Sequence, residues 1–191
     1  MSATRLLVLG AIVQRGTAHG YRIRKDLDSW GAQLWGRIGQ GSIYHALRRL
    51  EADGMIVADS PGEASGPART RFSPTPEGSE HFRDLLERTL RSDEQDMAST
   101  MAGIGFMTTL PRARVITLLR ERLAAQHRRR ARVMDEHARH PGADWEHHIE
   151  AIRFWEQSAD AAIAWTEGVV ARLEAGEHAM ADDEERPLLA D

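Results

Sequence analysis

The sequence of 191 residues contains no cysteine, only one lysine and no long hydrophobic run. Without cysteine the chain has no disulfide, no thiolate nucleophile and no cysteine-based zinc site, so any metal would be held by histidine and carboxylate alone. The longest apolar stretch, Leu6 to Val13, falls far short of the ~20 residues that cross a bilayer, and no basic segment precedes it as in a signal peptide. We therefore expect a soluble, cytoplasmic protein with no membrane contact.

Common catalytic motifs are missing as well. The sequence has no glycine-rich phosphate loop, no nucleophile elbow and no paired-carboxylate motif, and its histidines are scattered without a residue that would orient them as bases. We expect the protein not to be an enzyme and to need no cofactor.

The charge is distributed unevenly along the chain. The net charge is −4, yet residues 1–91 carry 13 Arg and Lys against 10 Asp and Glu, a balance of +3, whereas residues 92–191 carry 12 against 19, a balance of −7. The first half is therefore the better candidate for contact with a polyanion.

Residues 1–91 have the pattern of three short helices, a β-hairpin and a fourth helix. Apolar residues recur at helical spacing, glycines 16, 31 and 54 end the first three helices, and Thr75 with Pro76 supplies a cap and first turn for the helix that runs to Leu90. Segments 55–59 and 69–73 are typical of paired strands around a Gly/Pro/Ser-rich tip. This order of elements is that of a winged helix-turn-helix.

The third predicted helix, from about Ser42 to Asp53, indicates what this fold would bind. Its apolar face must pack on the first two helices, and it consists of Ile43, Ala46, Leu47 and Leu50. The outward residues are Ser42, Tyr44, His45, Arg48 and Arg49. In helix-turn-helix proteins this surface enters the major groove, where arginine can take both acceptors of guanine. The alternative is that the arginines are only solvated surface and that Tyr44 packs.

The hairpin repeats the basic character of the third helix. Arg69 and Arg71 alternate with Thr70 and Phe72, so both arginines share a face that suits phosphate or minor-groove contact. The alternative is an edge strand protected by charge. Pro74 cannot donate to a ladder, which predicts that the second strand ends early.

Three motifs in this half resemble the PadR family of bacterial transcriptional regulators. They are GQGSIYHALRRLEADGMI from Gly39 to Ile56, HGYRIRKDL from His19 to Leu27 and TPEG from Thr75 to Gly78. The resemblance implies a homodimer that binds a pseudo-palindromic operator, usually as a repressor, and releases it when a small molecule or other signal reaches the C-terminal helices. It also implies that Ser42, Tyr44, His45, Arg48, Arg49, Arg69 and Arg71 contact DNA, although His45 stands where many members have proline.

The second half is typical of two long helices, one opened by Pro111 and one running from Asp144 to about Glu174. The last helix carries a seam at alternating spacings of three and four residues, namely Trp145, His148, Ile152, Trp155, Ala159, Ala162, Thr166, Val169 and Leu173. We expect Trp145, Ile152, Trp155, Ala159, Ala162, Val169 and Leu173 to join two copies. The alternative is a stripe that packs on the neighbouring helix of the same chain.

A second stripe, rotated by about one residue, runs along the same helix. It consists of Ala151, Phe154, Ser158, Ala161, Trp165 and Gly168. One stripe would serve the dimer and the other a pocket or a neighbouring domain. Phe154, Trp155 and Trp165 are candidate walls for a flat apolar effector, and the alternative is that they only pack.

Histidines gather around the break between the two long helices. His137, His140, His147 and His148 lie near Asp135, Glu136 and Asp144 in the sequence and would suit a divalent ion. Their spacing matches no standard helical histidine pair, so we assign no metal site.

The sequence thus predicts a mainly α fold with a small β-hairpin wing, divided into a winged helix-turn-helix DNA-binding domain (1–91), a helical dimerisation and possible effector domain (92–176) and an acidic flexible tail (177–191). The leading hypothesis is a ligand-responsive bacterial repressor that binds double-stranded DNA as a homodimer. The alternatives are a protein-interaction adaptor on the same scaffold and a metal-sensing repressor.

Overall fold

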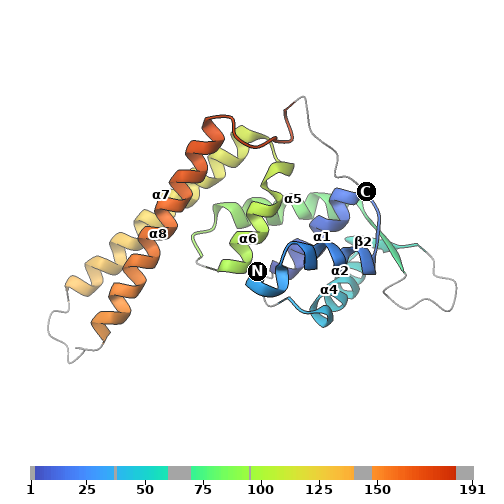
Figure 1. Ribbon diagram of the computed structural model, residues 1–191, viewed down its shortest axis with the longest axis horizontal. Helices are drawn as coiled ribbons and strands as arrows, with labels where there is room; N and C mark the ends of the chain where they lie inside the picture. The colour runs from blue at the N-terminus through green and yellow to red at the C-terminus, as the bar shows by residue number, and fades with distance from the viewer. Residues whose placement is uncertain (1–2, 37, 60–69, 95, 140–147, 184–191) are drawn as a thin grey trace. The chain divides into compact units, whose positions relative to one another are not determined.

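The structure of the protein is a computed structural model that describes residues 3–36, 38–59, 70–94, 96–139 and 148–183 (Figure 1). It is mainly helical with one small antiparallel sheet, as predicted, and it forms two compact units. The first unit comprises Met1–Thr89 and Asp96–Met107, and the second comprises Leu90–Gln95 and Thr108–Asp191. The division differs from the predicted boundary at residue 91, because a segment beyond it returns to the first unit.

Three helices build the core of the first unit, as the sequence predicts: α1 (Ala3–Arg15), α2 (Gly20–Ser29) and α4 (Gln40–Ala52). Each buries an apolar stripe, and α1 packs on both α2 and α4. Between α2 and α4 lies α3 (Ala32–Gly36), a single helical turn that was not predicted. It is too short to show helical periodicity in the sequence.

The wing is a three-stranded sheet in the order β1-β3-β2, formed by β1 (Ala18–His19), β2 (Ile56–Ala58) and β3 (Arg71–Pro74). Pro74 is the last residue of β3 and lies opposite Ile56, so the proline ends the strand without disturbing the pairing before it. β1 pairs with β3 and was not predicted, because two residues are too few to show alternation.

Helix α5 (Pro76–Arg91) begins with the predicted cap. The Thr75 hydroxyl accepts a hydrogen bond from the Gly78 amide at 2.9 Å and donates one to the Gly54 carbonyl at 2.8 Å. A Cβ at Gly78 would lie 1.8 Å from the Met55 carbonyl oxygen, so only glycine fits this approach. The cap thus ties the start of α5 to the chain between α4 and the wing.

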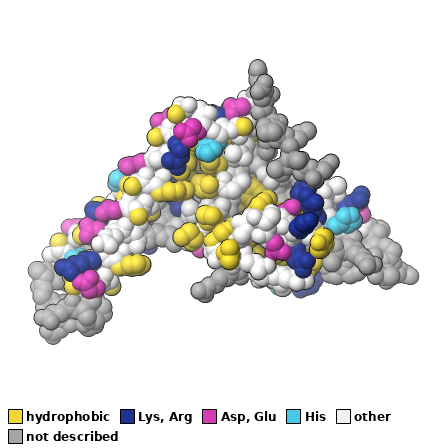
Figure 2. Space-filling view, in the orientation of Figure 1, with side chains coloured by type: hydrophobic (Ala, Val, Ile, Leu, Met, Phe, Trp, Pro, Cys, Tyr) yellow, Lys and Arg dark blue, Asp and Glu magenta, His cyan; other side chains and the backbone are white. Residues whose placement is uncertain are grey.

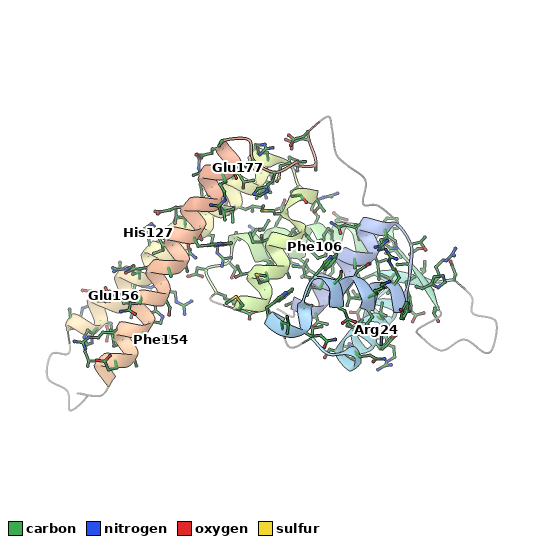
Figure 3. The ribbon with its side chains drawn as sticks, in the orientation of Figure 1. Arg24, Phe106, His127, Phe154, Glu156 and Glu177 are labelled. Atoms are coloured by element: carbon green, nitrogen blue, oxygen red, sulfur yellow. The ribbon has the colours of Figure 1, made fainter. Side chains whose placement is uncertain are left out.

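Helix α6 (Met97–Phe106) also belongs to the first unit, where it packs on α1 and α3. Asp96 caps it by accepting hydrogen bonds from the amides of Ala98 and Ser99. The ring of Phe106 meets Phe82 edge-on at 5.4 Å and Trp30 at 5.6 Å between centroids, and Phe106 is marked in Figure 3. This aromatic contact is why the segment joins the first unit. A one-turn 3₁₀ helix, η1 (Met107–Thr109), follows.

The second unit is a helical hairpin of α7 (Arg112–Ala138) and α8 (His148–Glu174), which pack along each other (Figure 1). The chain after α8 was predicted to be a flexible tail from residue 177, but through Asp183 it is packed in this unit, with Met180 completely buried. Within the residues that the structure covers, no helix has the length and hydropathy of a membrane span.

Candidate nucleic-acid interface

Helix α4 is held by its apolar face, which leaves the opposite face open. Ile43, Leu47 and Leu50 are at most 1% exposed. The helix follows Gly39 and ends before Gly54, whose φ of 73° allows the Met55 amide to reach the Leu50 carbonyl at 2.8 Å. Ala46 was predicted to share the buried face and is only half-buried, because it lies at the edge of the stripe.

The predicted DNA-contacting residues of α4 lie mostly on the open face. Ser42, His45, Arg48 and Arg49 are exposed, whereas Tyr44 is half-buried, at the edge of the packed face. Neither Arg48 nor Arg49 makes a salt bridge or side-chain hydrogen bond to any described residue. Both guanidinium groups are therefore available to a ligand.

Arginines elsewhere in the first unit are mostly committed to carboxylates. Arg15 and Arg22 both contact Asp26, Arg24 lies 3.9 Å from Asp28, and Arg5 bonds Asp53 at 2.7 Å. On α4 no acidic residue precedes Glu51, and Asp53 at the end of the helix interacts with the charge of Arg49 as well as with Arg5. On the visible face of this unit, Lys and Arg side chains lie beside a histidine and among Asp and Glu side chains (Figure 2). The charge pattern suits a polyanion.

The wing supplies one described arginine to the same unit. Arg71 is exposed, lies opposite His19 across the β1–β3 pair and precedes the buried Phe72, as the predicted alternation requires. Arg69, the other arginine predicted to contact DNA, lies outside the described residues.

A surface hollow of about 560 Å³ adjoins α4 and was not predicted. It lies between the first turn of α1 and the open face of α4, and its lining includes Thr4 and Arg5 from α1 and Ser42, His45 and Arg49 from α4. Thr4 and Arg5 were not predicted to be functional residues, since no local pattern marks residues that come together only in the folded unit.

Arg5 is held in a fixed position beside the hollow. Its Nη1 donates to Asp53 at 2.7 Å and its Nε donates to Nε2 of His81 at 3.3 Å. The hydrogen bond from Arg5 lowers the pKa of the Asp53 carboxyl. Burial, and after it the charge of Arg5, lowers the pKa of His81, which keeps this imidazole in the neutral form that can accept the bond.

In the second unit, the predicted dimer seam faces the chain itself over much of its length. Ala159, Val169 and Leu173 are at most 5% exposed, and Thr166 on the same stripe is completely buried. Because α8 packs on α7, the intrachain alternative describes this part of the seam. Ile152, Trp155 and Ala162 are half-buried, and Trp145 lies outside the described residues.

The second stripe of α8 is the open one. Phe154, marked in Figure 3, is 74% exposed and Trp165 is 39% exposed, and Ala151 and Ala161 on the same stripe are also exposed. Trp155 lies on the other stripe, with Ala159. The three candidate effector residues therefore do not line one common face.

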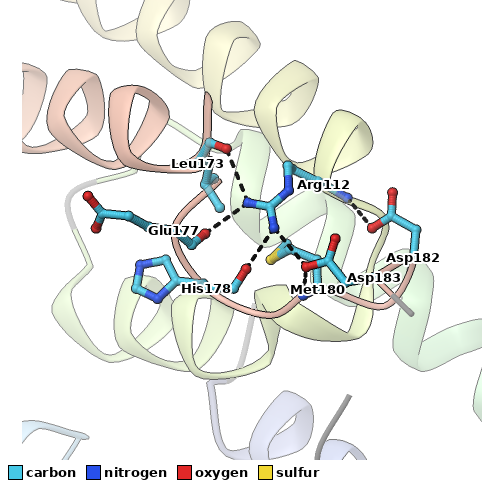
Figure 4. Close-up of polar contacts among 7 residues, drawn as sticks. All are labelled: Arg112, Leu173, Glu177, His178, Met180, Asp182 and Asp183. Atoms are coloured by element: carbon cyan, nitrogen blue, oxygen red, sulfur yellow. Dashed lines mark hydrogen bonds and ion pairs between the residues drawn. The ribbon is translucent and has the colours of Figure 1, made fainter. Parts of the chain in front are cut away.

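Ion pairs and a single arginine fasten the hairpin together. Arg130 of α7 bonds Glu156 at 2.8 Å and Asp160 at 2.5 Å on α8. Arg112 of α7 donates four hydrogen bonds to the end of α8 and the chain after it (Figure 4). Its Nη1 donates to the carbonyls of Leu173 at 3.1 Å and Glu177 at 2.8 Å. Its Nη2 donates to the carbonyl of His178 and to the carboxylate of Asp183, both at 2.7 Å. These bonds explain why the chain after α8 is packed.

The predicted histidine cluster can be judged only in part. His137 is exposed near the end of α7, His140 and His147 lie outside the described residues, and nothing is described of the His148 side chain. Among the residues that the structure describes, no three His, Asp or Glu side chains are grouped as a metal site requires.

The geometry defines a class of protein: a winged helix-turn-helix domain with an open third helix, joined to a helical hairpin. Residues 8–84 match the sequence model of the Transcriptional regulator PadR-like family, so the chain carries a PadR-like domain. The match agrees with the family resemblance that the three sequence motifs carry.

Several solved structures are similar to the chain. The crystal structure of Bacillus subtilis PadR in complex with operator DNA has 18% identity and a TM-score of 0.39, and the alignment covers 88% of this chain and 98% of that one. The crystal structure of the same protein in complex with p-coumaric acid has 17% identity and a TM-score of 0.40, and the alignment covers 90% of this chain and 99% of that one. The crystal structure of a PadR-like transcriptional regulator from Bacillus cereus has 21% identity and a TM-score of 0.38, and the alignment covers 91% of this chain and 99% of that one. No curated protein matches the chain.

Proposed function

We propose that the protein is a bacterial repressor that acts in the cytoplasm, binds a pseudo-palindromic operator as a homodimer and responds to a small molecule. The observation that carries this proposal is the open face of α4, where Arg48 and Arg49 are exposed and form no salt bridge with a described residue, whereas Arg5, Arg15, Arg22 and Arg24 of the same unit are paired with carboxylates. Arginine is the side chain that most often reads guanine in the major groove. Arg71 of the wing would add a phosphate contact beside the groove.

The homodimer follows from the limited reach of one domain. A single recognition helix reads only a few base pairs, whereas two helices held at a fixed separation read two half-sites and add their free energies. Since α7 covers much of the predicted seam, we propose that the open stripe of α8, with Phe154, Ala161 and Trp165, joins the two copies. Ile152, Trp155 and Ala162 would contribute at its border.

A gel shift with the DNA upstream of the protein's own gene tests the proposal. We expect a shift that an excess of the same duplex abolishes and an equal excess of unrelated duplex does not. Arg48→Ala should weaken binding by ~1–3 kcal/mol if this arginine contacts a base. Arg83→Ala, which removes an exposed arginine of α5, is the matched control and should bind normally.

Sedimentation of the free protein and of the complex would give the number of chains in each. Failure of the wild type to bind that DNA in preference to unrelated duplex would refute an autoregulatory repressor. A mass equal to one chain at the concentrations that shift DNA would refute the homodimer.

A further inference from the structure

The hollow between α1 and α4 brings together groups that typically bind phosphate. Arg5 and Arg49 place guanidinium groups at it, His45 an imidazole, and Thr4 and Ser42 hydroxyls. Guanidinium groups and hydroxyls are the side chains that contact DNA backbone phosphates most often. The hollow lies within the first unit and on the side of α4 that is open.

The geometry of α4 separates the two adjacent arginines. Successive residues are rotated by ~100° around a helix, so Ser42 and Arg49, seven residues apart, lie on one line and Arg48 is turned ~100° away from it. In agreement with this, Arg49 lines the hollow and Arg48 does not. His45 also lines the hollow, and around the helix Arg49 lies ~40° to one side of it and Arg48 ~60° to the other.

Arg5 has one donor group to offer beyond its structural bonds. Asp53 and His81 occupy Nη1 and Nε, and Nη2 has no hydrogen-bond partner within the described part of the chain. The single carboxylate of Asp53 interacts with both Arg5 and Arg49, so it offsets one of the two positive charges at the hollow. The hollow therefore keeps a net positive charge and a pre-positioned donor.

We propose that this hollow seats one backbone phosphate of the bound DNA in each half-site, with Arg49 and Arg5 as its contacts, while Arg48 faces the bases. The inference rests on the proposed function, because it assigns a role within the same DNA complex. A volume of about 560 Å³ exceeds that of a lone phosphate ion and leaves room for the attached sugars. A phosphate fixed beside the first turn of α4 would set the depth at which the helix enters the groove.

Salt titrations on two duplexes test this assignment. Affinity for the upstream DNA and for an unrelated duplex of equal length is measured by fluorescence anisotropy over a range of potassium chloride. The plot of log K against log salt has a negative slope, and the double variant Arg5→Gln/Arg49→Gln should make it shallower by ~0.9 because one phosphate contact is lost. The variant should also bind both duplexes more weakly by the same factor. Arg48→Gln should weaken the upstream duplex more than the unrelated one. Arg83→Gln, the control, should change neither.

A scan with single methylphosphonates identifies the phosphate itself. At one position in each half-site the neutral linkage should weaken wild-type binding and leave binding of Arg49→Gln unchanged. Arg49 makes no salt bridge to a described residue, so its replacement tests the site even if Arg5→Gln lowers the melting temperature. If no position shows this difference, or if Arg49→Gln changes base preference rather than the salt slope, the assignment is wrong.

Two further results distinguish the phosphate contact from a failure of the proposed function and from a site for a free anion. If the wild type binds neither duplex, the proposed function fails as a whole, whereas normal DNA binding with an unchanged salt slope in the double variant overturns the phosphate seat alone. Inorganic phosphate at constant ionic strength should not displace DNA. Binding of inorganic phosphate to the protein–DNA complex that Arg5→Gln abolishes would show a site for a free anion and would contradict the proposal.

Discussion

Replacing Arg112 tests whether one side chain closes the helical hairpin. In Arg112→Met the stem remains but the four hydrogen bonds of the guanidinium are lost, three of them to backbone carbonyls and one to Asp183. Hydrogen bonds to a charged group contribute ~1.5–3 kcal/mol each. They are not additive when they share one side chain, and the side chain of Arg112 is 21% exposed, so water can replace part of them.

We therefore expect Arg112→Met to lower the free energy of unfolding by ~3 kcal/mol, well below the sum of the separate bonds. Urea unfolding followed by circular dichroism measures this change. Hydrogen exchange measures the local effect, because the Met180 amide bonds Asp183 in the same cluster and should lose protection. Arg128→Met, on an exposed position of the same helix, is the control and should change stability by less than ~0.5 kcal/mol. Equal stability of the two variants, with Met180 still protected in both, would refute the reasoning.

Three further predictions concern other parts of the molecule. Gly41→Ala should raise the melting temperature, because alanine favours a helix by ~0.5–1 kcal/mol and a Cβ there meets no atom within 4 Å. It should nevertheless weaken DNA binding, because the methyl group points to the proposed interface. A variant that binds as tightly as wild type would contradict contact at this position. Because the pKa of His81 is lowered, the contribution of this residue to stability is complete above pH ~6.5, the ordinary histidine pKa, and is lost as the pH falls below that value. In His81→Gln the free energy of unfolding in urea should therefore decline less steeply between about pH 7 and pH 5 than in the wild type. An equally steep decline would contradict this. The double variant Phe154→Ser/Trp165→Ser should sediment with a mass closer to that of a single chain. Leu34→Ser, which removes a 90% exposed side chain from the first unit, is the control and should leave the mass unchanged. Dimers that persist in the double variant would rule out the open stripe as the dimer contact.

The sequence predicts α4 and its open face well because both depend on local spacing. Ile43, Leu47 and Leu50 lie on one side of any helix formed by this segment, so the position of Arg48 follows from periodicity alone. The wing was predicted for the same reason, since Phe72 alternates with Arg71. Where a residue lies at the edge of a stripe, as Ala46 and Tyr44 do, periodicity does not decide its burial.

The dimer seam shows what periodicity leaves open. The pattern from Ile152 to Leu173 predicts that α8 buries a stripe, but an apolar stripe packs equally well on α7 of the same chain or on a second copy. The structure gives the intrachain partner for Ala159, Val169 and Leu173. The hollow was missed because Arg5 and Arg49 are far apart in the sequence and meet only after α1 packs on α4.

Selection of binding sites from a pool of random duplexes, followed by sequencing, tests most directly whether the open face of α4 reads DNA. The account predicts that the wild type enriches an inverted repeat and that Arg48→Ala loses the preference at one base pair of each half while the remaining positions persist. Enrichment of no sequence by the wild type, or of the same sequence with the same preferences by the variant, would contradict it.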